Sequence, residues 1–224
     1  MTATHGSTGD FKPALRFDRL TALFDPVVAV TTRERTFKRL AIERARLRAG
    51  EEVLDLGCGT GTLALMAHAE QPGATIVGLD ADPAILRRAR AKAGAADVRI
   101  DFHEGLSNKL LFEDGRFDAV LSTLFFHHLS DDDKRATATE VLRVLAPGGR
   151  LVVADLGRPQ DPAMRVAVAA TVQLLDGRPT TSLNVAGGLP RLLADAGFEP
   201  VTVTDRLRTP IGTIELVSAG RPSG

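Results

Sequence analysis

The residues best suited to chemistry are three glycines at alternate positions, Gly57, Gly59 and Gly61, which follow an acidic residue in an apolar run. Glycine adopts positive φ readily and lets the backbone approach a ligand without a Cβ in the way. Cys58 has a side chain small enough to allow the same close approach of the backbone to a ligand. We expect its thiol to pack rather than to act as a nucleophile. Asp55 places a carboxylate where a pyrophosphate would be repelled and a cationic group attracted. These five residues therefore predict a site for a ligand that carries positive charge.

A second acidic residue, Asp80, ends the next apolar run, twenty-five positions after Asp55. An acid at this place can accept hydrogen bonds from both hydroxyls of a ribose. A cap or turn is the usual role of a strand-end Asp, and Asp82 before Pro83 illustrates it. The glycine spacing differs from the dinucleotide fingerprint G-x-G-x-x-G, because Thr62 stands where the third glycine should fall. An NAD-binding enzyme is thus an alternative that the spacing disfavours.

Two adjacent histidines, His127 and His128, are the candidate catalytic residues, because they follow the expected fourth strand. A histidine with a pKa near neutrality is the usual general base when a reaction removes a proton from a hydroxyl group or an acidic carbon. Both rings cannot point inward from an extended segment, and local packing is the alternative role. His5, His68 and His103 fit no metal-ligand spacing, so no metal site is expected.

The elements that must position these residues alternate along the chain. Short apolar runs predict strands at 53–56, 76–79, 98–102, 119–121 and 151–154. Helical spacing lies between several of them, at 83–94 and 130–145, and the order is typical of βαβ units. Pro147 and the two glycines after it predict a turn, and 201–204 with 214–217 predict an antiparallel hairpin around Pro210.

The two flanking regions differ from this core. Residues 1–11 are predicted to be a flexible tail, and 12–49 a helical extension that precedes a domain over 50–224. Residues 158–183 are rich in Pro and Gly and predict a substrate loop. Residues 1–50 hold ten basic and five acidic side chains, which indicates either an entrance for an anionic substrate or a helix with a solvated arginine face.

Composition limits the partners and the compartment. Lys plus Arg and Asp plus Glu each number 28, so overall charge does not favour nucleic acid as a partner. A single cysteine allows no intramolecular disulfide, and no apolar run reaches the roughly 18 residues of a membrane span. We expect a cytoplasmic protein without membrane insertion, and either a monomer or a homodimer.

Residues 53–61, VLDLGCGTG, resemble motif I of class I S-adenosylmethionine-dependent methyltransferases. Residues 115–122, 126–129 and 142–151 look like later landmarks of that family, and the likeness is closest to the small-molecule branch that includes ubiquinone and menaquinone biosynthesis enzymes. The resemblance implies a Rossmann-like α/β fold, with a seven-stranded mostly parallel sheet, helices on both faces and the last strand antiparallel. It also implies methyl transfer by in-line displacement to a small-molecule acceptor, with S-adenosylhomocysteine as product.

The resemblance adds Ala81, Gly105, Leu106 and Ser122 to the predicted cofactor site. After the third strand the family commonly has Gly-Asp-Ala, whereas residues 104–108 read EGLSN. We therefore expect a backbone contact to adenine near Gly105, with Glu104 or Asn108 as the acceptor of its amino group. Two further alternatives are a non-methylating reaction on the same cofactor and a non-catalytic binding subunit.

Overall fold

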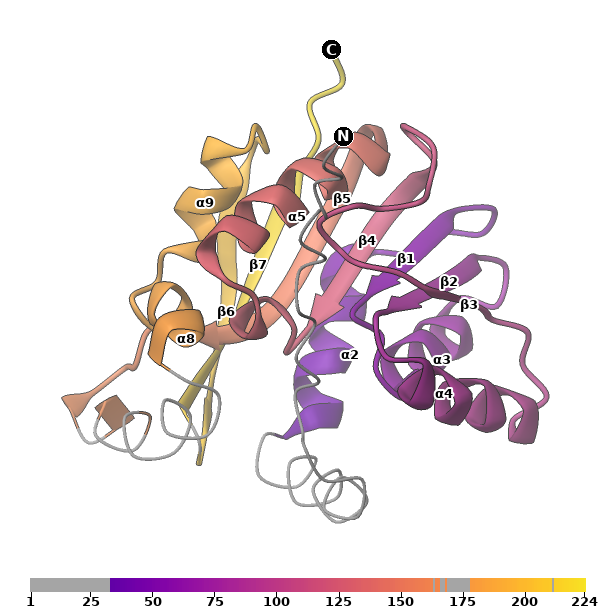
Figure 1. The fold of residues 1–224 in the computed structure, drawn as a ribbon, viewed down its shortest axis with the longest axis horizontal. Coiled ribbons are helices and arrows are strands. Elements are labelled where there is room, and N and C mark those ends of the chain that lie inside the picture. Colours follow the sequence, from indigo (N-terminus) through magenta and orange to yellow (C-terminus); the bar gives the residue numbers. More distant parts are fainter. Residues whose placement is uncertain (1–32, 163, 166–167, 169–177, 211) are drawn as a thin grey trace, which may run out of the picture.

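The computed structural model describes residues 33–162, 164–165, 168, 178–210 and 212–224. Its centre is a seven-stranded sheet in the order β3-β2-β1-β4-β5-β7-β6, in which β7 alone runs antiparallel to its neighbours (Figure 1). The strands are β1 (Glu52–Leu56), β2 (Thr75–Asp80), β3 (Asp101–Glu104), β4 (Phe117–Thr123), β5 (Leu145–Gly157), β6 (Val201–Thr209) and β7 (Gly212–Gly220). The predicted fold class is confirmed. The predicted tail, 1–11, and residues 12–32 of the extension lie outside the described residues.

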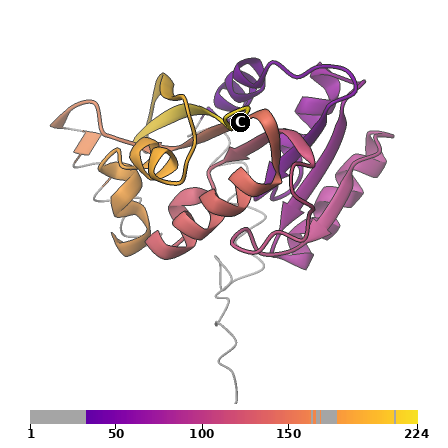
Figure 2. The same ribbon diagram turned by 90° about the horizontal axis from the view of Figure 1, so that it is seen from above.

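The described helices cover both faces of this sheet. They are α2 (Glu34–Ala45), α3 (Thr62–Glu70), α4 (Pro83–Ala95), the 3-10 turn η1 (Phe126–His128), α5 (Asp131–Val144), α8 (Arg178–Val185) and α9 (Leu189–Asp195). One core joins α2, α3 and α4 to the sheet, and a second joins α5 and α9 to the opposite face. Figure 2 shows α2 and α5 on opposite sides of the strands. Strands buried on both faces explain the continuous apolar runs of the sequence.

Local signals fix where the helices start. The Asp82 carboxylate accepts hydrogen bonds from the backbone N–H groups of Ala84 and Ile85, and Pro83 begins α4. The Ser130 hydroxyl likewise accepts a bond from the N–H of Asp133 at the start of α5. Both predicted caps are confirmed, because the side chains supply the acceptors that the first turn lacks.

Two predicted boundaries are wrong. The third strand begins at Asp101 rather than at 98, because β3 pairs with β2 only from Asp101 to Glu104. The predicted turn at 147–149 is instead an irregular part of β5, within which the pairing with β4 shifts register. Gly148 has φ +76° and donates its N–H to the carbonyl of Arg221, so pairing with the C-terminal segment replaces a free turn.

The segment that follows the carboxyl end of β5 includes the predicted substrate loop, 158–183. The described end of the predicted substrate loop, from 178 onward, is helical, because α8 begins at Arg178. This helix packs against η1 and β5. The predicted C-terminal hairpin is confirmed, with β7 inserted between β5 and β6. None of the helices in the described ranges is long and apolar enough to cross a membrane.

Candidate cofactor and acceptor site

The glycine loop connects β1 to α3 at the carboxyl edge of the sheet, and its three glycines all have positive φ. A Cβ on Gly57 would lie 2.4 Å from the ring of Phe125, and one on Gly61 would lie 2.9 Å from Phe102. A Cβ on Gly59 would meet nothing within 4 Å. Neighbouring rings therefore exclude side chains at the two ends of the loop, whereas its middle faces open space where a ligand can approach.

Hydrogen bonds hold this loop against the end of β2. The N–H groups of Gly57 and Cys58 both donate to the carbonyl oxygen of Leu79, at 2.8 and 3.0 Å. The N–H of Gly59 donates to Oδ2 of Asp80 at 2.9 Å. The structure thus brings the predicted loop and the predicted ribose-binding acid into direct contact. Ligands of open α/β sheets bind at this edge, where the strand order reverses between β1 and β4.

Asp55 carries an unpartnered buried oxygen at the base of the loop. Its side chain is 2% exposed, and Oδ2 has no hydrogen-bond partner among the described residues. Burial, with a smaller effect from Asp80, raises the pKa of Asp55 to about 7 against the opposing influence of Lys38. A buried carboxylate without a partner is costly, and a cationic ligand group supplies the missing charge and donor. The residue type and its environment therefore fit the amino-acid end of a sulfonium cofactor.

Asp80 and its neighbours form the other half of the candidate cofactor site. Its Oδ1 accepts the N–H of Asp82 at 3.0 Å, and burial raises its pKa despite these backbone hydrogen bonds. Ala81 follows Asp80 at intermediate exposure, and the Gly105 N–H donates to the Asp80 carbonyl at 3.0 Å. Leu106 is 51% exposed although it is a large apolar residue. An exposed leucine close in sequence to the Gly105 contact with Asp80 offers an apolar surface on which a flat base could lie.

Three side chains named for the site, those of Cys58, Ser122 and Asn108, make packing or tethering contacts within the protein. The Cys58 thiol is buried, and burial together with Asp55 and Asp80 raises its pKa, so it stays protonated and packs. The Ser122 hydroxyl is fully buried and donates to the carbonyl of Leu56 at 2.9 Å, which ties β4 to β1. The Asn108 amide donates to Asp133 at 2.7 Å, which directs it toward α5. The structure gives these three side chains packing and tethering contacts.

His127 forms a buried pair with Asp155 that spacing alone did not indicate. Nδ1 of His127 lies 2.6 Å from Oδ1 of Asp155, and the two side chains are 6% and 1% exposed. Burial by itself raises the pKa of Asp155, but the charge and hydrogen bond of His127 hold it below its usual value. The N–H groups of Phe125 and His127 also donate to Oδ2 of this carboxylate. The signal that could have identified Asp155 is an acid at the carboxyl end of an apolar strand, as with Asp55 and Asp80.

His128 differs from its neighbour. It is exposed to solvent, and the centroid of its ring lies 3.9 Å from that of His127. Partial desolvation of the ring, with the charge of the neighbouring His127, lowers the pKa of His128. The structure therefore distinguishes the two candidate bases, because an orienting carboxylate, that of Asp155, bonds to His127.

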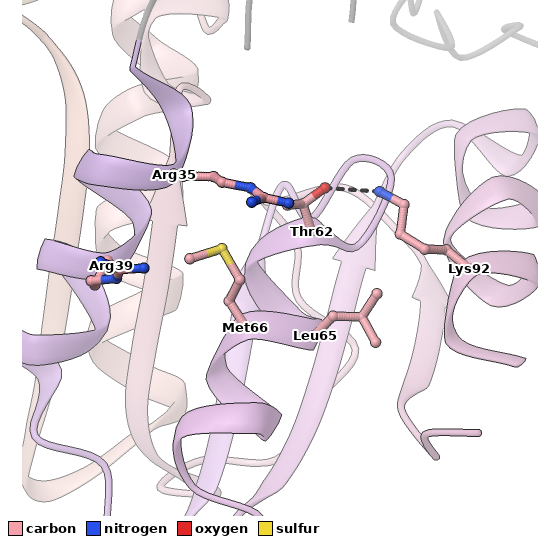
Figure 3. A pocket seen from close by; sticks show the side chains of 6 residues that line it. All are labelled: Arg35, Arg39, Thr62, Leu65, Met66 and Lys92. Atoms are coloured by element: carbon pink, nitrogen blue, oxygen red, sulfur yellow. Dashed lines mark hydrogen bonds between the residues drawn. The ribbon is translucent and has the colours of Figure 1, made fainter. Parts of the chain in front are cut away.

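A shallow pocket of about 270 Å³ lies beside the glycine loop, between α2, α3 and α4. Figure 3 shows Arg35 extending from α2 toward Thr62, which Lys92 approaches from α4. Arg35 and Arg39 are exposed on α2, opposite its buried Phe37. Neither Asp55 nor Asp80 lines this pocket, so it is distinct from the candidate cofactor site. The basic excess of the N-terminal region thus includes a solvated arginine face.

Known proteins share this arrangement. The chain matches the methyltransferase domain family over residues 53–149. It is 33% identical over 168 residues to the Synechocystis methyltransferase sll0829, which covers 75% of this chain and 76% of that protein. It is 43% identical over 123 residues to a demethylmenaquinone methyltransferase of Thermus thermophilus, over 55% of each chain. A solved structure of a methyltransferase from Methanosarcina mazei superposes with a TM-score of 0.66 at 22% identity, covering 82% of this chain and 97% of that one.

The strand order, the glycine loop and the two strand-end acids define a class I methyltransferase fold. The similarity over three quarters of both chains then fixes the family: the protein belongs to the S-adenosylmethionine-dependent methyltransferases. The chain spans about half the length of the Thermus enzyme that it matches.

Proposed function

We propose that this chain transfers a methyl group from S-adenosylmethionine to a small-molecule acceptor and releases S-adenosylhomocysteine. The observation that carries the proposal is the unpartnered, buried Oδ2 of Asp55 beneath a loop whose middle glycine faces open space. A site built for a pyrophosphate would not hold a carboxylate there, because the two charges repel. The raised pKa of Asp55, about 7, is the expected state of an acid whose cationic partner arrives with the ligand.

Each part of the candidate site suits one part of this cofactor. Asp55 would face its α-amino group, and Asp80 would accept hydrogen bonds from the ribose hydroxyls. The backbone of Ala81 and Gly105, with the exposed Leu106, would hold the adenine. The cofactor supplies a methyl group already activated by the positive charge of its sulfur. The chain then has to bind, align and exclude water.

We infer that His127 is the general base and that Asp155 orients it. The Asp155 carboxylate holds Nδ1 of His127 and stabilises the ring when it accepts a proton. Removing a proton from a phenolic hydroxyl or an acidic carbon makes that acceptor more nucleophilic. The demethylmenaquinone and phytylnaphthoquinone methyltransferases among its relatives suggest a hydroxylated naphthalene ring as the acceptor. The reduced ring is the competent form, because an oxidised quinone is too electron-poor to attack a methyl group.

The experiment that tests this proposal follows a labelled methyl group. The protein is incubated anaerobically with methyl-deuterated S-adenosylmethionine and a short-chain demethylmenaquinol, and mass spectrometry records both products. We expect one labelled methyl on the ring for each S-adenosylhomocysteine formed. Cofactor consumption without a labelled ring would instead support a non-methylating reaction, and no cofactor binding would support a binding subunit. Cytoplasmic location remains a prediction from the single cysteine.

A further inference from the structure

A second set of orphaned polar atoms lies in α8, the helix that packs against η1 and β5. Asn184, in α8, is 1% exposed, and neither its Oδ1 nor its Nδ2 has a hydrogen-bond partner in the described structure. Such carboxamides are rare, because leaving a buried donor and acceptor unpaired costs the full desolvation of both. Among the described residues, Asp55 in the predicted cofactor site also carries an orphaned buried oxygen.

Contacts at both ends place α8 against η1 and the end of β5, at the carboxyl edge of the sheet. Near its start, the Lys134 ammonium donates to the carbonyl of Thr180 and to that of Leu129, the residue that follows η1. Near its end, Gly187 lies against the side chain of Arg158, directly after β5. The helix therefore bridges η1, which carries His127, and the end of β5, which carries Asp155. Figure 1 shows α8 at this edge of the sheet.

The chemistry of the carboxamide indicates its ligand. Asn presents one acceptor oxygen and two N–H donors on a short, rigid stem. A hydroxyl group both donates and accepts, so it can satisfy the two orphaned ends of one carboxamide. A purely apolar ligand would leave them unpaired, and an ammonium would satisfy only Oδ1.

We infer that Asn184 binds an oxygen of the methyl acceptor and selects acceptors with a ring hydroxyl near the reacting atom. The inference rests on the proposed function and adds a residue to it that neither the spacing nor the family motifs indicated. The unpaired carboxamide reduces stability in the free protein and contributes affinity once the acceptor is bound, as is common for functional polar groups in protein interiors.

The test compares Asn184→Leu with a matched control, Ser218→Ala. Ser218 also has an orphaned buried oxygen. Its position in the sheet is opposite Val152, where β7 pairs with β5. Binding of 1,4-dihydroxynaphthalene is measured anaerobically by calorimetry with S-adenosylhomocysteine present, and thermal midpoints are recorded for the free proteins. We expect Asn184→Leu to bind the diol at least tenfold more weakly, with unchanged affinity for S-adenosylhomocysteine and an equal or higher thermal midpoint. Ser218→Ala should bind the diol as the wild type does.

Two results would overturn the inference. Equal affinity of the wild type and Asn184→Leu for the diol would show that the carboxamide does not contact the acceptor. No binding of the diol by the wild type would also overturn it, because the inference names an oxygenated ring as the ligand. Failure of the proposed function is distinguishable, because it appears as absent S-adenosylhomocysteine binding or absent methyl transfer by the wild type. A merely structural asparagine would lower the thermal midpoint when replaced and leave diol affinity alone.

Discussion

At the residue scale, two buried acids near the carboxyl ends of β1 and β5 differ in their affinity for protons. Burial raises the pKa of Asp55, whereas His127 and backbone N–H groups hold that of Asp155 below its usual value. The difference follows from partners, since both side chains are almost fully buried. Environments that push pKa values apart are typical of sites that divide binding from proton transfer. Asp55 is thus suited to meet a cation, and Asp155 to orient a base.

Replacing Asp55 by Asn should change how stability depends on pH. The folded pKa of about 7 lies above the ordinary value of 3.8, so Asp55 reduces stability progressively as pH rises from about 4 to about 7. Asn carries no charge and removes this loss. Urea unfolding at pH 5 and pH 8 should show that Asp55→Asn gains stability relative to the wild type at the higher pH. The same difference at both pH values would contradict the raised pKa.

Replacing Asp155 by Asn should lower kcat by about 10²- to 10⁴-fold, the usual contribution of a positioned acid or base. Affinity for S-adenosylhomocysteine should stay unchanged, because the proposed role of Asp155 is to orient the base and not to contact the cofactor. The acid limb of the pH–rate profile should move to lower pH, since loss of a negative charge favours the neutral ring of His127. His128→Ala is the matched control and should retain most activity. An unshifted profile in Asp155→Asn would argue for a purely structural pair.

At the element scale, the glycine loop is a turn whose backbone is fixed by its surroundings. Gly57→Ala should be strained twice, by φ +70° and by the ring of Phe125. We expect a lower thermal midpoint and a loss of S-adenosylhomocysteine affinity of at least tenfold. Gly59→Ala has positive φ but open space, so its effect on the midpoint should be smaller. Calorimetric titration and thermal melting of both variants separate the effect of the overlap with Phe125 from the effect of backbone strain. Equal thermal midpoints of the two variants would show that the overlap with Phe125 does not contribute.

The contact between α5 and α8 depends on a buried lysine. Lys134 is fully buried, and burial lowers its pKa, while the hydrogen bond and charge of Asp131 and the charge of Asp155 oppose this. Its ammonium also donates to the backbone carbonyls of Leu129 and Thr180. Lys134→Met keeps the apolar stem and removes the bonds to Leu129 and Thr180. Hydrogen exchange should accelerate in 178–185 while the strands keep their protection. Unchanged exchange there would show that packing alone holds α8.

At the scale of the whole molecule, α2 is part of the domain core. Phe37 and Ala41 are fully buried against the sheet, and the Arg150 guanidinium bonds to backbone carbonyls at the end of α2 and to Glu51. The described part of the predicted extension therefore packs as one unit with the strands. Its opposite side carries the exposed arginines of Figure 3.

Local patterns predicted most of the fold and half of the site. Alternate glycines, strand-end acids and capping residues are visible as local patterns of residue type and spacing, so Gly57, Asp80 and Ser130 were predictable. The contact between the glycine loop and the end of β2 was not visible in those patterns. The pair of His127 and Asp155 joins residues 28 positions apart, and only the register of β4 and β5 brings them together. Asn184 was not predicted because its missing partners are a property of the packed interior. The start of β3 depends likewise on pairing with β2.

The most direct test of the central claim is a calorimetric titration of the wild-type protein with S-adenosylhomocysteine and, separately, with NAD. The unpartnered Asp55 and the glycine spacing predict saturable one-to-one binding of S-adenosylhomocysteine and none of NAD. Tight binding of NAD with no response to S-adenosylhomocysteine would contradict the account.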